Sequence, residues 1–268
     1  MADDSTRGIR QPHRARRAIV ADSSAQLEQK IHAPVTDIEA LRSAASHPAL
    51  GEELALTLLE RRELPSAVLD DLAKNGRVMK YRKVRLTVVQ HPHTPRHVSL
   101  PLMRNLYTFE LMNVALIPGV AADVKVAAEE TLLSRFGTIS AGEKLTLGKQ
   151  GSARVAAGLL NDPDKRVVEA ALDNPYLTEQ WVIRAVLKPH PSAILSLHVS
   201  RHQKWSVRKD IRAALLRNEF TTLAHAIEFS QSFSLAALKE ILYQSDLPEK
   251  VREYLINTAE TRDAKRRG

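Results

Sequence analysis

Histidines are the side chains whose type and spacing come closest to metal or acid–base chemistry in this chain. They form a tight set, His91, His93 and His97, and a looser set, His190, His198 and His202. Imidazoles at such spacing can hold a transition metal, but a catalytic zinc site needs three good ligands and an oriented second shell. The tight set straddles two prolines in the segment HPHTPRH, where His91 takes a position that His47 holds in another unit of a repeated pattern. We therefore interpret this set as a break between helices and expect no metal site.

Other catalytic signatures are missing from the sequence. The 268 residues include no cysteine, which excludes disulfides, thiolate zinc sites, iron–sulfur clusters and cysteine nucleophiles. The sequence contains no HExxH, phosphate-binding loop, dinucleotide fingerprint or Gly-x-Ser-x-Gly elbow. It thus predicts no catalytic residue, no cofactor and no small-molecule substrate.

Lysine and arginine give the chain a formal charge of +8, which favours acidic partners. The ends carry most of this excess, because residues 1–20 contribute +3 and residues 260–268 contribute +2. Both ends lack apolar periodicity, so we expect a basic, mobile N-terminal tail over residues 1–33 and a basic C-terminal tail over residues 260–268. A single helical-repeat domain is expected over residues 34–259. Without a signal peptide or a membrane-length apolar segment, we expect a cytoplasmic protein with no membrane partner.

An internal repeat supplies the elements that must position these side chains. Five helical patterns each end in a polar or proline break, and we call the residue at each break the anchor: His47, His91, Ser134, Asn174 and Asn218. Successive anchors are 40 to 44 residues apart, which is the period of helical repeat arrays. Apolar residues stand seven and two positions before every anchor, so both face one side of a helix. Further helices are expected over residues 64–73, 107–117, 191–199 and 235–243, which gives about three helices per unit.

Local signals stop one helix and start the next at each break. Pro92 and Pro175 cannot continue a helix, because each lacks an amide proton. Hydroxyl side chains that can accept hydrogen bonds from the first amides of the next helix follow the anchors: Thr94, Ser140 (with Glu143), Thr178 and Thr222.

Two of these units resemble a known class of repeats. RVVEAALDNPYLTEQWVIRAVL and KVRLTVVQHPHTPRHVSLPLM are similar to HEAT-like and armadillo-like helical repeats, above all to the bacterial leucine-rich-repeat variant with its VR..VA.NP.TP..VL..L pattern. The resemblance covers about residues 38–245. It implies an all-α fold, a right-handed α-solenoid of about five repeats of 40–44 residues, and binding of another macromolecule. Ser134 and Glu219 depart from the Asn-Pro break of the pattern, which leaves the repeat count open.

Basic residues recur at one position of the repeat. Nine residues before the anchors, the chain has one apolar and four basic residues: Ile38, Arg82, Lys125, Lys165 and Lys209. Equivalent positions of a solenoid line up as a ridge, which here could hold phosphates or carboxylates. Lys83 extends this column within a run of six cations between residues 74 and 85. A second set has helical spacing and predicts one exposed stripe: Arg201, Lys204, Arg208 and Arg212. An ordinary solvated face is the alternative for all these positions.

Aromatic residues give little support to base reading. Trp181, Tyr176 and Phe220 stand at apolar or near-break positions, so we expect them in the core. Trp205, between Lys204 and Ser206, is the expected exception. Single-strand binders usually interleave cations with stacking aromatics, and this chain does not.

Three functions follow from these observations. The leading hypothesis is a non-enzymatic scaffold that binds another protein, with an acidic surface, on the basic ridge. The alternative is sequence-independent binding of duplex DNA through the same ridge and the basic tails. The third is excision of alkylated bases from DNA, which some HEAT-like proteins perform with a carboxylate, aromatics and arginine. Asp173, Trp181 and Arg184 form a conceivable trio for this reaction, but no family motif matches them residue by residue.

Overall fold

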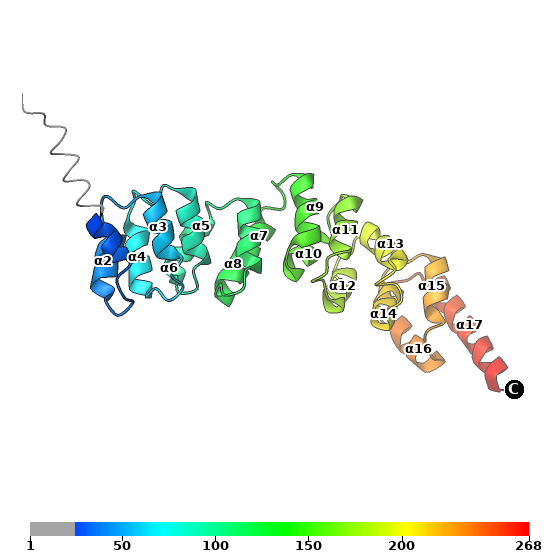
Figure 1. Cartoon of the computed structure of the whole chain (residues 1–268). Helices are drawn as coiled ribbons and strands as arrows, with labels where there is room; N and C mark the ends of the chain where they lie inside the picture. Colours follow the sequence, from blue (N-terminus) through cyan, green and yellow to red (C-terminus); the bar gives the residue numbers. More distant parts are fainter. Residues whose placement is uncertain (1–24, 268) are drawn as a thin grey trace, which may run out of the picture. The chain divides into compact units, whose positions relative to one another are not determined.

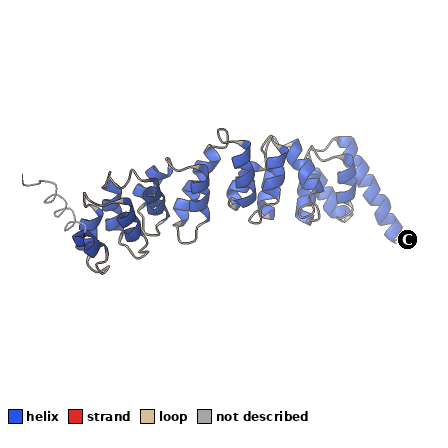
Figure 2. Ribbon diagram, turned by 45° about the horizontal axis from the view of Figure 1, so that its top comes forward, coloured by secondary structure: helices blue, strands red, loops and turns tan. Residues whose placement is uncertain are grey.

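A computed structural model of the chain describes residues 25–267. All regular elements within these residues are helices, and they contain no strand (Figure 2), so the all-α prediction is confirmed. Residues 1–24 of the predicted N-terminal tail lie outside the described part. Residues 25–31 form a helix instead of a tail, because Leu27 and Ile31 are buried. At the other end, residues 260–267 of the predicted C-terminal tail continue helix α17 (Glu249–Arg267).

Residue contacts divide the chain into two compact units. The first unit, residues 25–110 and 117–127, contains five complete labelled helices: α2 (Ile38–Ala45), α3 (Glu52–Leu59), α4 (Ser66–Lys74), α5 (Arg82–Gln90) and α6 (Arg96–Met103). The boundary crosses α7 (Thr108–Leu116) and α8 (Ala122–Ser134). The second unit continues with α9 (Ala141–Gln150), α10 (Ala153–Leu159), α11 (Lys165–Leu172), α12 (Glu179–Val186), α13 (Ala193–Arg201), α14 (Lys209–Arg217), α15 (Leu223–Ser230), α16 (Leu235–Tyr243) and α17. The single domain expected over residues 34–259 stays a prediction.

Most of these helices are seven to ten residues long, too short to be stable alone in water, so packing and caps must hold them. Two predicted caps are confirmed: Ser140 and Glu143 form a capping box on α9, and Thr222 accepts from the amide of His225 on α15. Thr178 stands at the N-cap of α12 without a side-chain hydrogen bond. Thr94 is not a cap, because its hydroxyl donates to the carbonyl of Val88 in the preceding helix.

Within the second unit the helices form two rows (Figure 1). Helices α9, α11 and α13 pack side by side in one row, and α10, α12, α14 and α16 form the other. The first unit repeats this alternation, because α2 packs on α4 and α3 packs on α5. In these pairs a helix therefore packs on the helix two places along the chain.

Hydrogen bonds between helix ends fix the direction of each row. After α11, the side-chain Nδ2 of Asn174 donates to the backbone carbonyls of Gly148 (2.7 Å) and Gly151 (3.0 Å) at the end of α9. After α14, the amide of Asn218 donates to Val186 at the end of α12 (2.7 Å). Helices of one row are thus parallel. The two rows are antiparallel, because the hydroxyl of Ser196, near the start of α13, donates to Asn218 at the end of α14 (3.0 Å).

The anchors found in the sequence are these helix-end residues. The side chain of each of four anchors accepts a hydrogen bond from the amide two residues later: His47, His91, Asn174 and Asn218. A second anchor of the same kind, which the sequence patterns did not reveal, stands 27 or 28 residues after four of the first anchors: Asn75, Asp162, His202 and Ser245. Three of the five repeats therefore have two anchors that accept this bond, and their first anchors are His47, Asn174 and Asn218.

At six anchors the residue three positions later is buried and the residue two positions later is exposed: His47, Asn75, His91, Asn174, His202 and Asn218. The buried residues at the third position include Leu50, Val78, Leu177 and Trp205. This rule corrects the prediction for the aromatics. Trp205 is buried, at 1% exposure, and its indole nitrogen donates to Leu172 (2.9 Å), so it belongs to the core. Tyr176 and Phe220 stand at the second position and are exposed.

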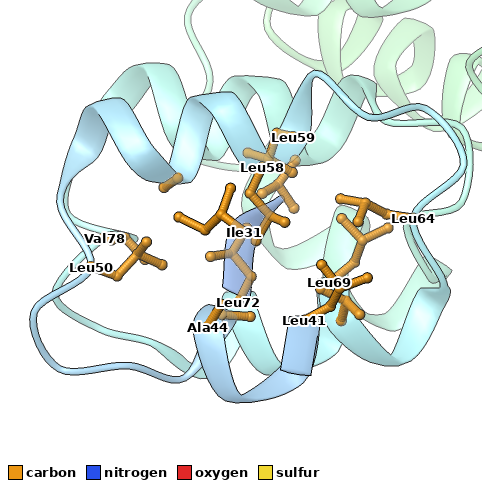
Figure 3. Packing of buried hydrophobic residues seen from close by; sticks show 14 of the residues in the cluster. Ile31, Leu41, Ala44, Leu50, Leu58, Leu59, Leu64, Leu69, Leu72 and Val78 are labelled. Carbon is orange, nitrogen blue, oxygen red and sulfur yellow. The ribbon is translucent and has the colours of Figure 1, made fainter. Parts of the chain in front are cut away.

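The core of the first unit is a cluster of aliphatic side chains from α2 to α6, the segments that connect them and the helix before them; Figure 3 shows part of it. It includes Ile31, Leu41, Leu58 and Leu72, all fully buried. The apolar residue two positions before the anchor is buried in each of the five sequence repeats: Ala45, Val89, Leu132, Leu172 and Leu216. The column seven residues before the anchors is buried at Val84, Val167 and Ile211 only.

Replacing His91 with asparagine is expected to weaken the pH dependence of stability. In His91, Nε2 donates to the carbonyl of Arg61 (3.0 Å) while Nδ1 accepts from the amide of His93 (3.3 Å), so a second ring proton would displace that amide. Burial lowers the pKa of His91 below its ordinary value, although the bond to Arg61 opposes this. The unfolded chain therefore binds a proton first, and the free energy of unfolding falls as the pH is lowered from about 7 through the unfolded-state pKa near 6.5.

Urea denaturation at several pH values between about 7 and 5 tests this prediction. His91→Asn keeps one donor and one acceptor in the places that Asn174 and Asn218 use, so its stability near pH 7 should stay within about 1 kcal/mol of the parent. An equal loss of stability on acidification in both proteins would show that His91 is not responsible.

Candidate functional site

The basic residues predicted in the first unit are partly neutralised. The guanidinium of Arg82 forms an ion pair with Glu110 (2.6 Å) and lies over the ring of Tyr107. Burial alone would raise the pKa of Glu110, but hydrogen bonds from Arg82 and the Tyr107 amide lower it below its ordinary value. Lys83 is exposed and Lys125 is half-buried, and neither has a carboxylate within 4 Å in the described part of the chain.

The structure contradicts the prediction that four basic residues form one stripe along a helix: Arg201, Lys204, Arg208 and Arg212. Helix α13 ends at Arg201 and α14 begins at Lys209. The segment between them is a turn, in which the anchor His202 bonds the amide of Lys204 and Trp205 packs into the core. Lys204 and Arg208 instead flank the indole of Trp205, and Arg208 pairs with Glu179 (2.7 Å). Arg212 is held by the Ser206 carbonyl, the Ser232 hydroxyl and Glu228.

The predicted ridge is also broken within the second unit. Lys165 is the first residue of α11 and Lys209 is the first residue of α14. These helices belong to different, antiparallel rows, so their first residues lie at opposite edges of the unit. The repeat of 44 residues contains three helices, whereas the rows alternate with every helix. Equivalent positions in successive repeats therefore change rows and do not form one ridge there.

Five of the six histidines in the two predicted sets contact a backbone carbonyl or a carboxylate: His91, His93, His97, His198 and His202. His93 contacts the carbonyl of Leu64 (3.0 Å), and His97 pairs with Asp70 (2.9 Å). On α13 and just after it, His198 pairs with Glu169 and His202 with Asp173. Residues 25–267 contain no group of three or more histidine or carboxylate side chains placed to hold a metal.

A pocket of about 480 Å³ lies between α10 and α12 in the second unit. Its walls come from two helix faces with the same spacing, residues 154, 157, 158 and 161 on one side and residues 181, 184, 185 and 188 on the other. The first three residues of each set share one side of α10 or of α12, and Asn161 and Lys188 lie two residues beyond the ends of these helices. Gly158 and Ala185 occupy matching places in the two sets, and the absence of a side chain at Gly158 makes room for Leu133 and Phe136, which a Cβ atom there would meet. Leu133 of α8 closes one wall.

The pocket combines an apolar floor with cations. Arg184 and Lys188 are exposed and have no carboxylate within ion-pair distance among the described residues, whereas Arg154 pairs with Glu130 (3.1 Å). Trp181 is half-buried and contacts Arg184. The lining includes no carboxylate of its own. We call this site, defined by Arg154, Ala157, Gly158, Asn161, Trp181, Arg184, Ala185 and Lys188, the α10–α12 pocket. The sequence predicts Trp181 in the core and groups it with Arg184 and Asp173, so it does not identify this pocket, where Trp181 is half-buried.

The trio considered for base excision does not share this pocket. Asp173 follows the end of α11 in the other row, and its carboxylate contacts His202 (3.1 Å). Trp181 and Arg184 line the α10–α12 pocket without it. The pocket therefore holds no carboxylate from this trio that could act on a bound nucleotide.

Comparison of the chain with protein-family models, curated proteins and solved structures found no match. The resemblance to HEAT-like repeats therefore stays a prediction. Among residues 25–267, no helix has both the length and the apolar character that crossing a bilayer requires.

Proposed function

We propose that this chain is a non-enzymatic helical-repeat protein that binds an acidic segment of a partner protein at the α10–α12 pocket. The observation that carries the proposal is the pairing of two exposed cations, Arg184 and Lys188, with an apolar hollow whose lining has no carboxylate. Carboxylates approaching the pocket meet positive charge without competition from an acidic side chain in its lining. Electrostatic complementarity of this kind selects acidic partners and speeds their association.

The repeat architecture supports a binding role. Paired anchors recur through the chain, and two of the spans of 44 residues, which begin at Ile38 and Lys165, hold three helices each. We retain the proposal of about five repeats in a right-handed α-solenoid, because stacked helical repeats bury a continuous core and present extended surfaces to partners. The binding surface proposed here differs from the ridge expected from the sequence.

Charge reversal at the pocket tests the proposal. Fluorescence anisotropy at low salt would measure the affinity of the full chain for a labelled polyglutamate peptide and, separately, for random duplex DNA. Arg184→Glu combined with Lys188→Glu is expected to weaken peptide binding about tenfold or more, because two attractions become repulsions. The matched control, Lys165→Glu combined with Lys209→Glu, changes net charge equally and is expected to change peptide affinity less than twofold.

Each other outcome is informative. A loss of binding in the control pair but not in the pocket pair would place the site at the first residues of α11 and α14. Duplex binding that exceeds peptide binding, and that falls steeply with added salt in both variants, would favour the nucleic-acid alternative. Absence of peptide binding by the parent chain at low salt would contradict the proposed function.

A further inference from the structure

The α10–α12 pocket has features that bulk charge attraction does not need. Its apolar lining, called the floor below, consists of Ala157, Gly158, Ala185, Leu133 and the indole of Trp181. A purely electrostatic surface gains nothing from a hollow of this kind. A volume near 480 Å³ lies within the range of about 300–1,000 Å³ that is typical of ligand pockets.

The polar groups stand around the apolar floor. Arg154, Arg184 and Lys188 all line the same pocket, so cations are present on both walls. A ligand that places an apolar group in the pocket would hold the groups next to that apolar group beside these cations. Negative charges beside that group would therefore meet Arg184 and Lys188, which have no ion pair among the described residues, whereas Arg154 is already paired with Glu130.

Asn161 adds a separate indication of an occupant. This residue lines the pocket, and its Oδ1 atom is buried without a hydrogen-bond partner. A buried acceptor that lacks a partner carries a free-energy cost, and rotation of the Asn161 side chain toward a donor bound in the pocket would relieve it. The backbone N–H of a peptide is such a donor.

We infer that the α10–α12 pocket binds a short peptide in which one aromatic or large aliphatic side chain is flanked by acidic residues. The apolar side chain lies against Trp181 and the floor, the flanking carboxylates contact Arg184 and Lys188, and a peptide N–H donates to Asn161. This inference rests on the proposed function and names the class of segment that the partner supplies. An aromatic anchor in a pocket with a polar rim is the arrangement that concentrates binding energy at protein interfaces.

Two peptides that differ only at the anchor test the inference. Labelled EEFEE and EEAEE peptides carry the same charge, and their affinities for the full chain would be measured by anisotropy. We expect EEFEE to bind about tenfold more tightly or better, because only phenylalanine removes a large apolar area from water. Equal affinities would overturn the pocket inference while leaving the acidic-partner proposal intact, and binding of neither peptide would overturn both.

A substitution that fills the pocket tests whether the preference for EEFEE over EEAEE arises there. Ala157→Met extends a half-exposed side chain of α10 into the hollow and should abolish the preference for EEFEE while leaving the affinity for EEAEE within about twofold. Ala213→Met is the matched control, because Ala213 is half-exposed on α14 of the same row and does not line the pocket. Persistence of the preference in Ala157→Met would overturn the assignment. Should that variant fold poorly, Trp181→Ala provides the same test and is expected to reduce the preference several-fold.

Discussion

Replacing Asn174 with aspartate is expected to lower the free energy of unfolding of the second unit by about 3–5 kcal/mol. Asn174 is fully buried, and its amide nitrogen donates to the carbonyls of Gly148 and Gly151. Aspartate places a second oxygen where that nitrogen stands, so two carbonyls lose their donor and face negative charge. The amide of Tyr176 would keep its acceptor, so the loss falls on the contact between α9 and α11.

Urea denaturation followed by circular dichroism measures this loss, and hydrogen exchange shows whether α9 and α11 lose protection first. Asn257→Asp on the exposed side of α17 is the control and should change stability by no more than about 0.5 kcal/mol. A loss below about 1 kcal/mol in Asn174→Asp would show that the anchor does not hold the row together.

Trp205 is the second position where a large effect is expected. Trp205→Ala should destabilise the chain by about 3–5 kcal/mol, because it leaves a cavity beneath the end of α11. Trp205→Phe keeps most of the apolar volume and removes only the donor to Leu172, so its expected cost is about 1–3 kcal/mol. Thermal and urea denaturation of both variants would show whether Trp205→Ala loses more stability than Trp205→Phe.

Trp181→Ala separates a core role from a surface role. Trp181 is half-buried at the α10–α12 pocket, so its truncation should cost clearly less stability than that of Trp205. Equal losses at the two tryptophans would contradict the assignment of Trp205, the third residue after the anchor His202, to the core.

The helical fold and one half of its anchor system could be predicted from the sequence. Apolar spacing predicted the four additional helices that the structure contains as α4, α7, α13 and α16. Asn174 and Asn218 were visible as anchors because they are identical and 44 residues apart. The second anchors were missed because four different side chains perform the same task, so no column of similar residues marks them: Asn75, Asp162, His202 and Ser245.

The surface predictions failed for two physical reasons. The stripe through Arg201 and Arg212 assumed a continuous helix, and neither proline nor glycine marks the break that His202 makes. The ridge through Lys165 and Lys209 assumed that the sequence repeat equals the packing repeat. A unit of three helices in an array of two rows places equivalent residues at alternate edges. The sequence does not predict the α10–α12 pocket, because its two sets of lining residues are 27 residues apart and the repeat of 44 residues does not align them.

Photo-crosslinking tests the central claim, that the α10–α12 pocket is where an acidic partner segment binds. The experiment uses the full chain with an EEFEE peptide in which benzoylphenylalanine replaces phenylalanine, followed by mass spectrometry of the adducts. The predicted result is that crosslinks concentrate on residues 154–161 and 181–188 and disappear in the Arg184→Glu and Lys188→Glu double variant. Crosslinks concentrated elsewhere on the chain, or unchanged in the double variant, would contradict the claim.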